Sequence, residues 1–170
     1  MHFAKCIFRR FFIHKKQAVA CTCSGRQHHI AFTLLCRLLP RHLGHVSDGY
    51  TYMMSLGYDE VAKICLTHSF NNQTTKEYIG KFDVFDEELN LIKNTLAKVD
   101  MSDYDRLIQL CDSLAGSEGV LDIEERMGDV KQRYGYYPQE KWDSNIRLKK
   151  YFEEKAGKDI YEIVDKTFRL

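Results

Sequence analysis

Asp112 is the residue whose position most strongly suggests chemistry. It lies in the apolar run LIQLCDSLAG, one residue after Cys111 and four after Ile108, so a helix would bring it close to a buried face. A carboxylate near such a face is costly unless it is paired or binds a metal ion. The spacing alone leaves an alternative open, in which Asp112 is a solvated carboxylate on the outer flank of the helix.

Two histidines and one acidic pair also stand out. His45 occurs in GHVSDGY and His68 in CLTHSF, but His45 could be a loop histidine. His68, near the end of a predicted helix, could simply be a favourable charge at the C-terminal dipole. The run Glu124-Glu125-Arg126 is most simply an exposed helix face with local ion pairs. Taken one at a time, none of these residues predicts a function.

The charge of the chain is divided between two segments. The whole chain of 170 residues has a net charge of +1, yet all 24 acidic residues lie from Asp48 onward. The first 47 residues therefore carry about +8 and the remainder about −7. The overall balance points to no particular partner, and we expect no nucleic acid. No apolar run reaches the roughly 18 residues needed to span a bilayer.

Three interpretations of the atypical basic segment 1–44 remain open. An Arg-rich, acid-free start is typical of a mitochondrial transit peptide, although Ser24 is its only serine within this segment. A metal-binding tail could use Cys21, Cys23, His28 and His29, but Cys-x-Cys is tighter than a structural zinc knuckle. We favour the third, an out-of-frame translation. If residues 40–42 are coded CCN, CGN and CAY, a one-base shift permits His-Asp-Ile.

The apolar spacing from His45 onward is helical, which predicts an all-α domain. We expect a first helix capped by Ser47 or Asp48 and stopped by Gly57, and a second from Asp59 to about His68. Further helices are predicted to start at Asp86, after Ser102 (capping box with Asp105), at about Leu121 and at Pro138 as the first helical residue. Asp159 caps a last helix over 160–168. Cys65 and Cys111 fall in apolar positions, as free cysteines of a cytoplasmic protein would.

The sequence around the candidate residues is similar to a known family. The run GHVSDGYTYMMSLGYDEVAKICLTHSFNNQ, followed by DYDRLIQLCDSLAGSEGV, resembles bacterial HD-domain phosphohydrolases with additional histidines after the His-Asp pair. The resemblance covers about residues 45–170 and implies a single HD-type helical bundle. Family members hold one or two divalent metals with a first-helix His, the His-Asp pair, two later histidines and a final Asp. The resemblance assigns the later histidines to His45 and His68 and the final Asp to Asp112.

The His-Asp pair itself is missing, because no His is followed by Asp anywhere in this chain. The family resemblance implies hydrolysis of a small phosphorylated substrate, such as a nucleotide. A metal ion clamps the phosphate oxygens and lowers the pKa of a bound water. Manganese, iron, zinc and magnesium all suit imidazole and carboxylate ligands. Without the pair we expect impaired activity, and the alternative is a non-catalytic helical module that binds a nucleotide or a protein.

Overall fold

The computed structural model describes residues 41–116 and 119–164. The predictions for residues before 41, and for the last helix beyond Val164, lie outside this part of the chain. The described residues are all-helical, as predicted, and hold no strand beyond a single β-bridge between Ala115 and Val120. The seven α-helices are α3 (Gly44–Ser55), α4 (Asp59–Thr67), α5 (Asp86–Leu96), α6 (Asp103–Leu114), α7 (Ile123–Tyr134), α8 (Gln139–Ala156) and α9 (Ile160–Ile163), with a 3-10 turn η1 (Thr75–Glu77).

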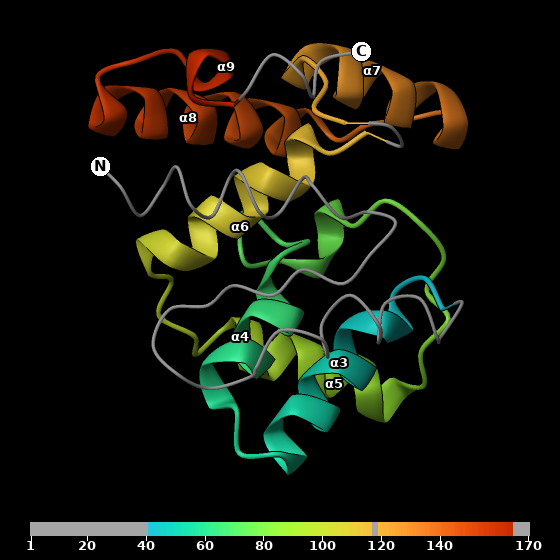
Figure 1. The fold of residues 1–170 in the computed structure, drawn as a ribbon. Coiled ribbons are helices and arrows are strands. Elements are labelled where there is room, and N and C mark those ends of the chain that lie inside the picture. Colours follow the sequence, from blue (N-terminus) through green and yellow to red (C-terminus); the bar gives the residue numbers. More distant parts are fainter. Residues whose placement is uncertain (1–40, 117–118, 165–170) are drawn as a thin grey trace.

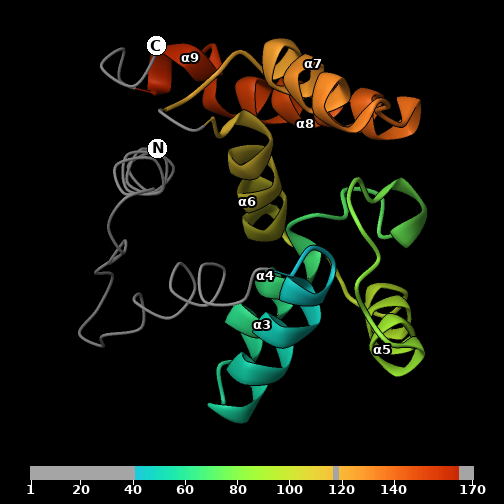
Figure 2. The ribbon, with the colours of Figure 1, turned by 90° about the vertical axis from the view of Figure 1, so that its right-hand side faces the viewer.

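The helices form two tiers that α6 joins. Helices α3, α4 and α5 lie together in one tier, and α7, α8 and α9 lie together in the other (Figures 1 and 2). Helix α6 runs between them and contacts α4 on one side and both α7 and α8 on the other. None of the described helices has the length and apolar content to cross a bilayer.

Buried apolar side chains hold each tier together. The core that α6 shares with the tier of α7, α8 and α9 includes Leu107, Leu110, Leu114, Met127, Leu148 and Ile160. In the α3–α5 tier the core includes Leu43, Val46, Leu66, Phe70, Ile92 and Leu96. Ile64 of α4 belongs to the first of these cores, so α4 packs on α6 as well as on its own tier. Burial of such side chains from both tiers fixes the position of the helices around α6.

Most predicted helix ends are confirmed because their signals are local. Ser102 and Asp105 form the predicted capping box of α6, and the Asp159 side chain accepts a hydrogen bond from the Tyr161 N–H at the start of α9. Gly157 ends α8 with a φ of 63°, in the left-handed region that favours glycine. Pro138, expected as a first helical residue, is instead the N-cap of α8.

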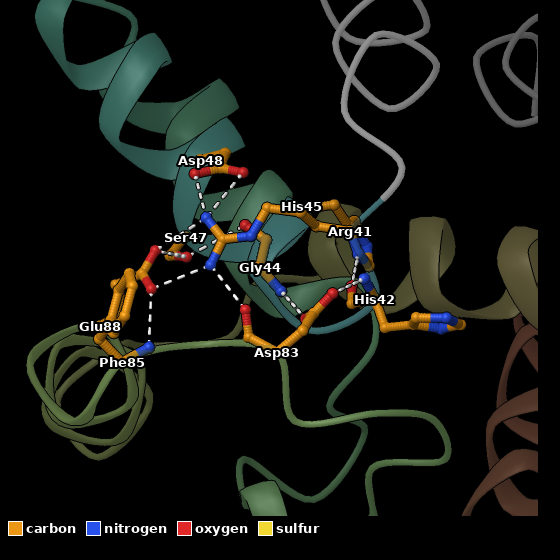
Figure 3. Close-up of polar contacts among 9 residues, drawn as sticks. All are labelled: Arg41, His42, Gly44, His45, Ser47, Asp48, Asp83, Phe85 and Glu88. Carbon is orange, nitrogen blue, oxygen red and sulfur yellow. Dashed lines mark hydrogen bonds and ion pairs between the residues drawn. The ribbon is translucent and has the colours of Figure 1, made fainter.

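The prediction for the start of the first helix is wrong. Helix α3 begins at Gly44, before Ser47 and Asp48, and neither of these residues caps it. The Asp83 carboxylate accepts hydrogen bonds from the backbone N–H groups of His42 and Gly44, as Figure 3 shows. A cap that comes from a distant segment satisfies the free N–H groups of a helix start and leaves no local sequence signal.

Candidate functional site

A cavity of about 370 Å³ opens between the two tiers and is lined by residues of α3, α6, α7 and α8 and of the segments before α3 and after α4. All three residues singled out in the sequence, His45, His68 and Asp112, line it. His45 lies in the first turn of α3, His68 directly follows α4, and Asp112 lies in the last turn of α6. Folding therefore brings together three side chains that are far apart in the sequence.

The two imidazoles face each other through their Nε2 atoms, which are 3.2 Å apart. Each Nδ1 atom contacts a backbone carbonyl, that of His42 for His45 and that of Cys65, at 2.9 Å, for His68. A carbonyl oxygen only accepts hydrogen bonds, so both Nδ1 atoms carry the proton. In the neutral rings, both Nε2 atoms then direct lone pairs towards each other. Such a pair is stable when a proton or a metal ion lies between the rings.

The environment of His68 favours its neutral form. Burial lowers the pKa of His68, and the neighbouring His45 lowers it further, while Asp112 opposes both effects. A neutral imidazole is the form that binds metal ions. A hydrogen bond from the other ring nitrogen to a carbonyl is also the usual second contact of a metal-binding histidine.

Asp112 is less buried than its place in an apolar run predicted. Its side chain is exposed, whereas the preceding Cys111 is fully buried, so the helix directs the carboxylate away from the core. Of the two interpretations of Asp112, the solvated carboxylate on the outer flank of the helix is therefore the one that agrees with its exposure. The flank on which Asp112 lies nevertheless forms part of the cavity wall, where its charge acts on His68.

The imidazoles of His45 and His68 are of the kind that binds divalent metal ions, but too few ligands lie together. Two imidazoles with their Nδ1 atoms already bonded are typical metal ligands. Among the residues described, however, no three His, Cys, Asp or Glu side chains are grouped closely enough to hold a metal ion. His45 and His68 could thus contribute two ligands, and Asp112 stands in the same cavity without completing a group.

An ion-pair network around Arg41 fixes the turn that carries His45 (Figure 3). The Arg41 guanidinium donates to Asp48 at 3.1 Å and to Glu88 at 2.9 Å. It also donates to the Asp83 carbonyl at 2.7 Å. These contacts tie the start of α3 to α5 and to the segment before it. The start of α3, and with it His45, is therefore held from outside its own helix.

The far wall of the cavity contains residues that the sequence did not single out. Lys141, half-buried in α8, donates from Nζ to the Ser69 carbonyl at 2.8 Å, next to His68. Burial lowers the pKa of Lys141, and Asp112 is the first of the two acidic groups that oppose the change. Asn71 donates to Asn145, which donates to the Tyr137 hydroxyl at 2.8 Å. No local pattern marks Lys141 or Asn145, because their contacts with Ser69 and Asn71 join segments more than 70 residues apart.

The comparisons with known proteins add no relative to this description. No protein-family model matches the chain, no curated protein matches its sequence, and no solved structure matches its fold.

Proposed function

We propose that this chain binds a divalent metal ion and a small phosphorylated ligand in the cavity between its tiers, as an HD-type phosphohydrolase with impaired turnover. One observation carries the proposal: the Nε2 atoms of His45 and His68 face each other at 3.2 Å while both Nδ1 atoms contact carbonyls. This arrangement suits two ligands of one cation and is unfavourable for two neutral rings with nothing between them.

The side chains of the cavity have separate tasks in this proposal. His45 and His68 hold the metal ion, and Asp112 contributes negative charge to the same cavity. The metal, when bound, would polarise phosphate oxygens and lower the pKa of a bound water. The cavity volume of about 370 Å³ is of the size that encloses a small organic ligand. Nucleotides are therefore among the phosphorylated compounds that could be accommodated.

The small number of metal ligands favours low turnover. It also supports a second candidate function, binding without hydrolysis. No group of three metal-binding side chains occurs among the residues described, so a bound metal would rely on two imidazoles and solvent. Such a site should bind metal weakly. A helical module that binds a phosphorylated ligand without hydrolysing it is the alternative function that this observation favours.

Metal titration and a phosphatase assay on the full chain test the proposal. We expect calorimetry to detect weak binding of Mn²⁺ or Zn²⁺, and p-nitrophenyl phosphate to be hydrolysed slowly or not at all. His45→Ala and His68→Ala should each remove the metal binding. His42→Ala is the matched control, because His42 lines the cavity while its ring bonds to neither imidazole of the pair in the described structure. Metal binding that survives both substitutions in the pair would refute the proposal.

A further inference from the structure

We propose that Lys141 is the phosphate anchor of the cavity, its ammonium group binding a phosphoryl oxygen of the ligand; the inference rests on the proposed function. Lys141 reaches the cavity from the first turn of α8, on the tier opposite α3 and α4. Its Nζ contacts the carbonyl of Ser69, the residue that follows His68. This contact joins α8 to the backbone that follows His68 and so links the two tiers.

The ammonium group has donors left for a ligand. A lysine ammonium has three N–H donors. One of them is used by the Ser69 carbonyl at 2.8 Å, and the structure shows no other hydrogen bond from Nζ among the residues described. Phosphate oxygens are strong acceptors, and charge-assisted hydrogen bonds to them are stronger than neutral ones. A phosphoryl group beside Ser69 would satisfy the remaining donors.

The charge of Lys141 is also available, unlike that of the other cations in the cavity wall. Arg41 is paired with Asp48 and Glu88, and Arg126 forms an ion pair with Asp129. Lys141 has no carboxylate within ion-pair distance in the part of the chain that the structure describes. The carboxylates of Asp112 and Glu77 act on this half-buried charge only from beyond ion-pair distance, so an anionic ligand in direct contact would compensate it further.

A neutral donor lies near the same wall. The Tyr137 hydroxyl accepts a hydrogen bond from Asn145, which leaves its own proton for another acceptor. Burial raises the pKa of Tyr137 to about 12, although the hydrogen bond from Asn145 opposes this change. The hydroxyl therefore keeps its proton at neutral pH and can donate to a second phosphoryl oxygen. Lys141 and Tyr137 together would receive the phosphate, while His45 and His68 lie across the cavity.

Calorimetric titration of the full chain with inorganic phosphate, in EDTA to exclude metal, tests the anchor. We expect wild-type protein to bind phosphate and Lys141→Ala to bind it at least about tenfold more weakly, the effect of losing a charged hydrogen bond. Lys141→Gln, which can still donate to the Ser69 carbonyl, should weaken binding equally, whereas Lys141→Arg should retain most of it. Lys150→Ala is the matched control, because Lys150 lies on the same helix with its side chain 76% exposed.

The outcomes separate the anchor from the proposed function. Phosphate binding that is unchanged in Lys141→Gln, with the fold intact by circular dichroism, would overturn the anchor and leave metal binding by the histidines untouched. Wild-type protein that does not bind phosphate would overturn it as well. Phosphate binding that depends on Lys141, in a protein that takes up no metal, would support the anchor and remove the metal-dependent hydrolysis.

Discussion

Two facing imidazoles are the strongest chemical feature of this molecule. His45 and His68 are each fixed by a carbonyl three residues earlier in the chain, so the position of each ring is set by its own backbone. Their approach to 3.2 Å is set by the packing of α3 against α4. The fold therefore fixes the positions of the two Nε2 atoms relative to each other, as the proposed metal site requires.

A double-mutant cycle tests whether the imidazoles act as one unit. We expect His45→Ala and His68→Ala each to weaken metal binding by at least about 100-fold, which removes it from detection at a weak site, because a lost direct ligand costs at least as much as a lost outer-shell partner. The double variant should lose little more than either single variant, because a shared ion needs both rings. Calorimetric titration with Zn²⁺ measures all four proteins. Additive losses would show that the two histidines bind separate ions.

Residue-level reasoning from the sequence succeeded only in part. His45, His68 and Asp112 were selected from the sequence and do line one cavity. The physical reason given for Asp112, a costly buried carboxylate, was wrong because its side chain is exposed. Lys141 could not be found in this way, since its ammonium group donates to a carbonyl 72 residues earlier in the chain.

At the scale of the elements, the helices were predictable because helix starts and ends are mostly local. Asp59, Asp86 and the Ser102–Asp105 box each introduced a helix where expected. The start of α3 could not be predicted, because the carboxylate that accepts from its first N–H group belongs to Asp83, 39 residues beyond Gly44.

The link between α3 and α5 should depend on pH through Glu88. The hydrogen bond from Arg41 lowers the pKa of Glu88 below its ordinary value of 4.5. Because this pKa is lower in the folded than in the unfolded chain, ionised Glu88 stabilises the fold above that ordinary value. The stabilisation, about 1 kcal/mol for a partly buried pair, is lost as the pH falls through the lowered pKa.

Urea unfolding at a series of pH values measures this contribution. In Glu88→Gln, the free energy of unfolding should fall less steeply than in wild type between about pH 5 and pH 3. Glu87→Gln is the control, because Glu87 is exposed on the same turn of α5. Equal slopes for wild type and Glu88→Gln would contradict the role of the Arg41–Glu88 pair.

The buried carboxylate of Asp105 in α6 pairs with Lys63 of α4, so the stability of this helix contact should depend on Lys63. The Asp105 side chain is fully buried, and its Oδ2 atom lies 3.1 Å from the Lys63 Nζ. The Oδ1 atom of Asp105 has no hydrogen-bond partner among the described residues. Lys63→Met would leave this charge with only the donors of Ser102. We expect a loss of about 2 kcal/mol in the free energy of unfolding, below the full cost of breaking a buried pair.

Urea unfolding of Lys63→Met and of a surface control measures this loss. Lys150→Met removes the exposed pair with Glu154, at 3.8 Å, and should change stability by less than about 0.5 kcal/mol. A Lys63→Met protein as stable as the control would show that Asp105 is adequately compensated by its own helix start.

At the scale of the whole molecule, the cavity depends on both tiers. His45 and His68 come from the α3–α5 tier and Lys141 from α8, while α6 supplies Asp112 between them. A ligand that contacts both walls would bind the folded arrangement alone and therefore stabilise it. The all-α class is confirmed, but the HD type of the bundle remains a prediction.

Position 41 links the reading-frame hypothesis to this cavity. Arg41 and His42 line the cavity that contains the two imidazoles. The shifted frame permits His-Asp-Ile at positions 40–42, which would replace the Arg41 guanidinium by a carboxylate. A carboxylate at this position would offer the two imidazoles a third metal-binding group, which the described residues do not supply. Asp48 and Glu88 would lose their shared partner, so the start of α3 should also change.

Replacing residues 1–44 by the shifted-frame translation tests this link. We expect the repaired chain to bind Mn²⁺ or Zn²⁺ more tightly and to hydrolyse p-nitrophenyl phosphate, because a restored His-Asp pair adds ligands to His45 and His68. Asp112→Ala in the repaired chain should abolish hydrolysis and leave the helical circular dichroism unchanged. Asp100→Ala, at an exposed position outside the cavity, should leave both the hydrolysis and the circular dichroism unchanged. Hydrolysis that survives the loss of Asp112 would exclude it from the site, and a repaired chain with unchanged metal affinity would remove the reading-frame hypothesis.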